Sequence, residues 1–122
     1  MTATEWLQSP ARMLYGGALA VIADAALTGA IATTLPPRTA YAMLDLHMNF
    51  LRPVFGDGRD ITARARVEHR GRSFAVARCE VQNADGKTAV IASGSAMILP
   101  GRSWDALHPV VPADEEPTGD DD

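Results

Sequence analysis

Apolar residues recur at helical spacing in the first third of the chain. Over residues 17–34 they keep the i, i+3, i+4 intervals of one helix stripe, whose members are Leu19, Ile22, Ala23, Ala26, Leu27, Ala30 and Ile31. Pro36 and Pro37 follow and predict where the helix stops, because proline cannot continue it. The only charge in this segment is Asp24, so we expect the helix to be buried on every side, unlike a surface helix.

From residue 40 onward the hydrophobic period changes to two, which is typical of strands. The pattern predicts strands over residues 40–52, 59–70, 73–83 and 88–99, with the last one stopping at Pro100-Gly101. In the first strand, alternation puts Ala42, Leu44, Leu46, Met48 and Phe50 on one face and Tyr41, Met43, Asp45, His47 and Asn49 on the other.

One helix followed by four strands predicts an α+β fold in which an antiparallel sheet wraps a single helix. The third strand has a face of small residues suited to close approach of that helix, made of Ala75, Ala77, Cys79 and Val81. A sheet of this kind leaves its outer face and its edges exposed. We therefore expect it to pair with a second copy of the chain.

The length and the charge of the chain limit the number of domains and the classes of partner that we expect. The 122 residues allow one domain, which we place at residues 1–102. Residues 103–122 are rich in acids and prolines, and we expect a tail that is disordered from about residue 110. Six of the fifteen acids lie in residues 114–122, so residues 1–113 are only mildly basic. It has no basic run interleaved with aromatic residues, and we exclude nucleic-acid binding.

The expected cellular compartment follows from the cysteine content and from the first residues of the chain. Cys79 is its only cysteine, and its first residues carry no basic segment of the kind that opens a secretory signal. The most apolar stretch, residues 16–35, contains Asp24 and many small residues, which makes it too polar to span a membrane. We therefore expect a cytoplasmic protein that is not membrane-bound.

Asp24 is the first candidate for chemistry. It lies two turns into the predicted helix, too far from the start to cap it, among neighbours that cannot solvate a carboxylate. Burial of an unpaired carboxylate costs several kcal/mol, which functional sites tolerate. Asp24 is therefore a candidate general base or nucleophile, unless backbone groups or an arginine of a partner subunit satisfy it.

Gly16-Gly17 opens the same helix. The first N–H groups of a helix have no partner within it, and the helix dipole favours negative charge there. These amides are candidates for an oxyanion hole that holds a carbonyl oxygen, with Asp24 two turns further along to act on the acyl carbon or on a water. The alternative is that the two glycines only let the chain turn tightly.

Four segments together resemble the PaaI-type branch of the hotdog-fold acyl-CoA thioesterases. They are GGALAVIADAA at 16–26, LDLHMNFLRP at 44–53, HRGR at 69–72 and DGK at 85–87, and the resemblance spans roughly residues 5–100. It implies a curled antiparallel sheet around one helix, a homodimer or dimer of dimers, and active sites at the subunit interface. In relatives a further helix or strand usually precedes the part that resembles residues 5–7, so we expect either a short version of the domain or a late start codon.

The resemblance also implies roles for individual residues. Asp24 would be the base or nucleophile, Gly16 or Gly17 the oxyanion donor, and Thr28 a support for water. Ser9 and Tyr15 stand where the family often has Asn or Gln and His, and Met43 where many relatives have Ser or Thr. Ser9 can still donate to a thioester or a water, while Tyr15 and Met43 fit an apolar acyl pocket.

Arginine side chains are candidates for the phosphates of coenzyme A, through charge-assisted bonds. The candidates are Arg52, Arg70, Arg72 and Arg102, and in relatives the loop that holds Arg70 and Arg72 contacts the nucleotide. His47 and Asn49 are expected near the interface, and Asn49 is also a candidate to bind the substrate. His47, His69 and His108 do not have metal-ligand spacing, and we expect no metal and no cofactor other than the CoA of the substrate.

The reaction expected from the family resemblance and these candidate residues is hydrolysis of a medium-chain or aromatic acyl-CoA to the free acid and CoA. Two alternatives remain open. One is an acyl-CoA binder or sensor without turnover, favoured by the identities of Ser9, Tyr15 and Met43. The other is a hydratase or dehydratase of an enoyl thioester, which normally needs a histidine that this helix lacks.

Overall fold

The computed structural model describes residues 1–2 and 7–104. They form one helix, α1 (Gly16–Ala32), and four strands: β1 (Thr39–Phe50), β2 (Thr62–Arg70), β3 (Phe74–Gln82) and β4 (Thr88–Ser103). The strands make one antiparallel sheet in the order β1-β4-β3-β2, so β1 and β2 are its edges. The predictions about the acidic tail and about His108 lie outside the described residues.

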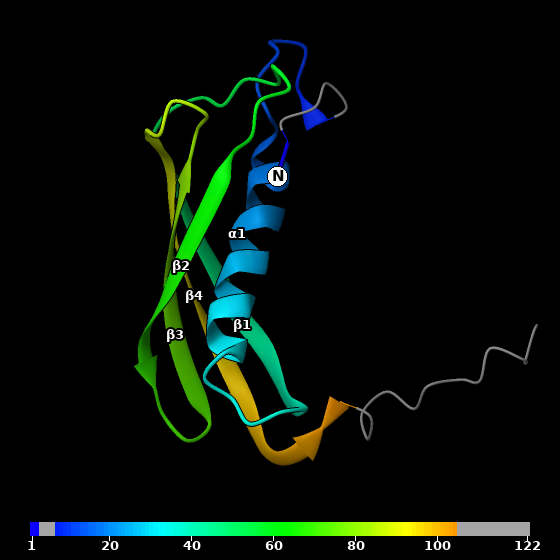
Figure 1. Ribbon diagram of the computed structural model, residues 1–122, viewed down its shortest axis with the longest axis vertical. Coiled ribbons are helices and arrows are strands. Elements are labelled where there is room, and N and C mark those ends of the chain that lie inside the picture. Colours follow the sequence, from blue (N-terminus) through cyan, green and yellow to red (C-terminus); the bar gives the residue numbers. More distant parts are fainter. Residues whose placement is uncertain (3–6, 105–122) are drawn as a thin grey trace, which may run out of the picture.

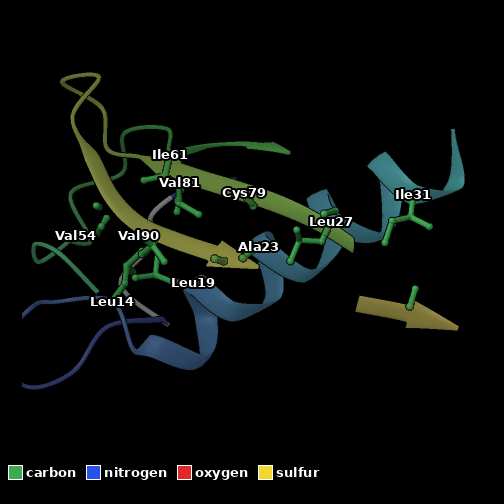
Figure 2. Close-up of a cluster of buried hydrophobic side chains, with 14 of the residues drawn as sticks. Leu14, Leu19, Ala23, Leu27, Ile31, Val54, Ile61, Cys79, Val81 and Val90 are labelled. Atoms are coloured by element: carbon green, nitrogen blue, oxygen red, sulfur yellow. The ribbon is translucent and has the colours of Figure 1, made fainter. Parts of the chain in front are cut away.

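The helix stripe predicted from the sequence is the side that packs on the sheet. Leu19, Ala23, Leu27 and Ile31 are buried. Of these, Ala23 and Leu27 point toward the small-residue face of β3, where Cys79 and its neighbours are also buried (Figure 2). Because those β3 side chains are short, the helix lies close to the strands. The helix ends one turn before Pro36, where the N–H of Thr34 bonds the carbonyl of Ile31 at 3.0 Å.

The sheet covers only one side of α1, which packs mainly on β2 and β3 (Figure 1). Val21, on another side of the helix, is 67% exposed, and Gly17, Ala25 and Gly29 are exposed as well. The prediction that the helix is buried on every side is therefore wrong for a single subunit. None of the helices in the described ranges is long and apolar enough to cross a membrane.

A bulge in β1 corrects the predicted faces of that strand. Met43 pairs with Ala96 and Asp45 with Ser95, which leaves Leu44 as an extra residue. One extra residue reverses the alternation. Before the bulge Tyr41 and Met43 face the helix, whereas after it the helix side holds Leu46, Met48 and Phe50, opposite Gly94, Ala92 and Val90.

The other end of the sheet also departs from the prediction. β4 does not stop at Pro100-Gly101 but continues to Ser103, which pairs with Thr39. Between this pair and Ala40 paired with Leu99 the register shifts. Because the residues from Pro100 to Arg102 stand outside the ladder, the missing N–H of proline costs no hydrogen bond, and Gly101 takes a positive φ of 73°.

Candidate active site

A tight turn and a bond to a neighbouring loop fix the start of α1. The N–H of Ser9 donates to the carbonyl of Met13 at 2.6 Å, and the N–H of Leu14 donates to the carbonyl of Val54 at 2.7 Å. Tyr15 is the N-cap residue, with an extended backbone (φ −60°, ψ 143°) and no side-chain cap. Backbone hydrogen bonds, rather than a side-chain cap, thus hold the start of α1 in place.

The first two amides of the helix are free. The N–H groups of Ala18 and Leu19 donate to the carbonyl of Tyr15 at 3.0 and 3.3 Å, but those of Gly16 and Gly17 find no acceptor within residues 1–2 and 7–104. The first turn also holds no acid. Two unpaired donors at the positive end of a helix dipole suit an anionic or strongly polarised oxygen.

A cleft of about 470 Å³ lies beside this helix start. It is lined by Met13, Leu14, Gly16, Leu19, Phe50, Leu51, Arg52, Pro53 and Val54, so its wall is apolar apart from one arginine. The predicted substrate residue Arg52 is therefore near the predicted oxyanion donor Gly16. An apolar cleft with a few polar groups is the usual form of a site for a small organic ligand.

Asp24 is half-buried rather than enclosed. Its carboxylate has no hydrogen bond or ion pair to any residue in the described part of the chain. Its place on the helix is on the side that the sheet leaves uncovered, near the exposed Val21. The carboxylate is therefore available to a water, a substrate or a second subunit.

One helix does not bring its own Gly16 and Asp24 together. The two residues are eight positions apart, which at 1.5 Å per residue is about 12 Å along the axis. A reacting carbonyl must lie about 3 Å from both its oxyanion donor and the attacking atom. Within one helix this separation is too long for Asp24 to attack directly a carbonyl held by Gly16, and the roles predicted for the two residues stay predictions.

Thr28 uses its hydroxyl within the helix. The hydroxyl donates to the backbone carbonyl of Asp24 at 2.8 Å, with the carbonyl of Ala25 as a second acceptor at 3.1 Å. The phenol of Tyr41 reaches the carbonyl of Thr28 at 3.5 Å. Because the only hydroxyl hydrogen is engaged, Thr28 can support a water by accepting a hydrogen bond from it, but not by donating one.

Two of the residues that depart from the family pattern lie close to the helix start. The hydroxyl oxygen of Ser9 is buried and has no partner among the described residues. Tyr15 is 55% exposed at the N-cap. Met43 lies elsewhere, on the helix-facing side of β1, with its methyl group beside Gly94, and it packs against the core.

The remaining candidates lie far from the helix start within one subunit. Asn49 is on the outer face of the sheet, where it lines a hollow with His47, Arg78 and Ser93. Arg70 bonds the hydroxyl of Thr34 at 3.2 Å, just past the C-terminal end of α1, and Arg72 follows it in the turn between β2 and β3. Within one subunit, these residues therefore lie far from Gly16.

Two features were missed by the sequence analysis. The first is Phe50, whose ring lies against Gly16 in the cleft. The second is Asp45, whose carboxylate accepts the N–H of Ser95 at 2.8 Å in the β1 bulge. Cys79 lies on the helix-facing side of β3, as predicted, and its burial there raises the pKa of this thiol, which keeps it protonated. The described residues contain no cluster of three His, Cys, Asp or Glu side chains able to hold a metal ion.

The profile of the thioesterase superfamily matches residues 12–90. The chain belongs to this superfamily. The match includes α1, its two glycines, Asp24 and the cleft residues. The protein is a thioester hydrolase, and its sheet around one helix is the hotdog fold. No curated protein is significantly similar to the chain in sequence.

Similar solved structures agree with the assignment to the thioesterase superfamily. A phenylacetic acid degradation-related protein of Ralstonia eutropha is 29% identical, with a TM-score of 0.73, over 79% of this chain and 70% of that one. The PaaI protein of E. coli is 28% identical, with a TM-score of 0.70, over 81% and 69%. These two confirm the predicted resemblance to PaaI-type thioesterases.

A third structure, from Bacillus halodurans, was solved with CoA. It is 24% identical, with a TM-score of 0.70, and covers 78% of this thioesterase. The thioesterase spans 66% of the length of that protein, just under two thirds. At this identity the likeness shows the common fold.

Proposed function

We propose that the protein hydrolyses acyl-CoA thioesters with a medium-chain or aromatic acyl group, and that each active site forms between two copies of the chain. The observation that carries the proposal is the pair of unpartnered groups on α1. The free amides of Gly16 and Gly17 border an apolar cleft, and the unpartnered carboxylate of Asp24 lies on an uncovered side of the same helix.

The two groups meet if two helices pack antiparallel around a two-fold axis near Ala20. Each residue then faces the one equally far beyond Ala20, so that Gly16 of one copy faces Asp24 of the second. The surface around that axis carries small or exposed side chains, Gly17, Val21 and Ala25, which allow close approach. β1 is an edge strand of the sheet and can pair with its own copy.

In this arrangement the carbonyl oxygen of the thioester accepts hydrogen bonds from the amides of Gly16 and Gly17, which stabilise the charge that develops on it. Asp24 of the second copy takes a proton from a water that attacks the carbonyl carbon. In the alternative route Asp24 itself attacks and forms an anhydride, which water then hydrolyses. Either route breaks the bond to sulfur and releases the free acid and CoA.

Antiparallel packing also gives the distant arginines a role. Arg70 lies at the C-terminal end of its own helix, beside Thr34. With the axis near Ala20, the end of that helix at Ala32 lies about 12 Å beyond the start of the helix of the second copy, measured along the helix axes. We propose that Arg70 and Arg72 of one copy bind CoA phosphates at the site of the other, at that distance from the thioester. The CoA in the B. halodurans structure and the phenylacetic acid degradation-related relative support CoA and aryl-acyl chemistry as the first classes to test.

The test is release of CoA, followed with a thiol reagent, from aryl, short, medium and long acyl-CoAs. Wild type and Asp24→Asn are compared, with Asp60→Asn as the matched control because Asp60 is an exposed acid that only bonds the hydroxyl of Thr2. We expect Asp24→Asn to lower kcat by about 10²- to 10⁴-fold and the control to match wild type. Acyl-CoA binding without turnover by wild type would favour the sensor instead. Hydration of an enoyl-CoA would favour the hydratase.

A further inference from the structure

Phe50 occupies the space directly in front of the helix start. It is the last residue of β1, on the side of the sheet that faces α1. A Cβ atom placed on Gly16 would lie 3.0 Å from Cζ of Phe50 and 3.4 Å from the nearer Cε. The tip of the ring therefore rests on Gly16, and only a residue without a side chain lets it lie so close.

The ring is also a wall of the cleft. Phe50 and Gly16 both line the 470 Å³ cleft, and the Phe50 side chain is 55% exposed. A core aromatic residue is normally covered, whereas this ring has one edge on the backbone of Gly16 and much of its surface open to the cleft. At Gly17, by contrast, no atom lies within 4 Å of the position that a Cβ would take.

We propose that Phe50 is the residue that sets acyl specificity, by excluding acyl groups that are branched at the carbon next to the carbonyl. The inference rests on the proposed function, in which the carbonyl oxygen is held by the first amides of α1. The carbonyl carbon and its neighbouring carbon then lie beside Gly16, where the ring already fills the space on one side. A linear chain passes along the ring into the cleft, and a methyl branch at this carbon meets the ring.

The size of the effect follows from the cost of misplacing one methyl group. A hydrophobic pocket discriminates by about 10- to 200-fold for such a difference. Octanoyl-CoA and 2-methylheptanoyl-CoA are isomers that differ only in branching at this carbon. We expect wild type to prefer the linear isomer by at least about tenfold in kcat/KM.

The decisive variant is Phe50→Ala, which removes the wall, with Phe50→Leu as the variant that keeps part of it. Phe74→Ala is the matched control, because Phe74 is a similarly exposed ring (43%) that pairs with Met97 on the outer face of the sheet. We expect Phe50→Ala to bring the preference for the linear isomer to within about threefold of unity, Phe50→Leu to be intermediate, and Phe74→Ala to keep the preference of wild type. An unchanged preference in Phe50→Ala would overturn the inference.

A binding measurement tests the role of Phe50 independently of whether the proposed hydrolysis takes place. CoA analogues in which a methylene replaces the thioester sulfur keep the carbonyl but cannot be hydrolysed, and their Kd is measured by calorimetry. The linear analogue should bind wild type more tightly than the branched one, and Phe50→Ala should remove the difference even if no thioester is turned over. Equal Kd values in wild type, or no binding of either analogue, would contradict a role for Phe50.

Discussion

At the scale of single residues, the proposed hydrolysis depends on hydrogen-bond donors and acceptors that the fold leaves unpaired. Gly16 is the clearest of them, because it lines the cleft and its N–H has no acceptor among the described residues. A glycine pair at a helix start and a lone acid within a helix are visible without a structure, so Gly16 and Asp24 could be proposed from the sequence, and their catalytic roles stay predictions. The helical rise then shows that the two residues of one chain lie about 12 Å apart along the axis, a distance that only the proposed second chain removes.

Gly16→Pro tests the amide directly. Proline is favoured at the first position of a helix, and Tyr15 before it already has the extended backbone that a residue before proline needs. Gly16→Ala adds a Cβ at the same place but keeps the N–H, so it is the matched control. We expect kcat of Gly16→Pro to be about 10²-fold below that of Gly16→Ala. Equal values would assign the oxyanion to Gly17 alone.

At the scale of elements, β1 shows why only part of the site could be predicted from the sequence. Its alternating residues predicted a strand correctly, but nothing in the alternation marked the extra residue Leu44, so Met43 and Asn49 were placed on one face. The bulge separates them across the sheet. The bond from the Ser95 N–H to the Asp45 carboxylate accounts for the position of the bulge, because it satisfies a backbone donor that the ladder leaves unpaired.

Removing the carboxylate of Asp45 should lower the stability of the sheet. Asp45→Ala leaves the N–H of Ser95 without its partner, and we expect the free energy of unfolding to fall by about 1 to 3 kcal/mol. Asp45→Asn keeps a side-chain carbonyl that can accept the same bond and should lose less. Urea unfolding followed by circular dichroism measures both variants. Similar stability of Asp45→Ala and wild type would show that the bond does not hold the bulge.

Close packing of β1 and α1 on β4 depends on Gly94. A Cβ there would lie 2.7 Å from the methyl group of Met43 and 3.0 Å from the carbonyl oxygen of Asp45, and the second contact is backbone that cannot move aside. We expect Gly94→Ala to lower the free energy of unfolding by about 1 to 3 kcal/mol. Gly29→Ala is the control, because nothing lies within 4 Å of its Cβ position and alanine favours the helix. Urea denaturation of the pair should shift the midpoints in opposite directions.

At the scale of the whole molecule, the structure leaves one side of α1 uncovered, and in the proposed function each site needs a second copy to complete it. The sequence predicted this second copy from the exposed outer face and edges of the sheet and from the family resemblance, and the exposed Val21 on the open side of α1 supports the same expectation. Light scattering after gel filtration should give at least twice the 13.0 kDa of the chain.

Val21→Asp is the variant that tests this assembly. A charge on a side chain that is 67% exposed is tolerated by an isolated subunit, but it costs several kcal/mol inside a helix interface. We therefore expect a smaller particle and loss of turnover together, with an unchanged circular dichroism spectrum. A Val21→Asp protein that keeps both its mass and its activity would place the interface elsewhere.

The most direct test of the shared site is complementation between two inactive chains. Asp24→Asn lacks the carboxylate and Gly16→Pro lacks the amide, so each protein alone should be inactive. When the two are unfolded together and refolded as a mixture, half of the dimers contain one chain of each kind, and one of their two sites has both an intact Gly16 and an intact Asp24. The account predicts that CoA release returns to about a quarter of the wild-type rate. A mixture no more active than its separate components would contradict it, because a site built within one chain cannot be restored in this way.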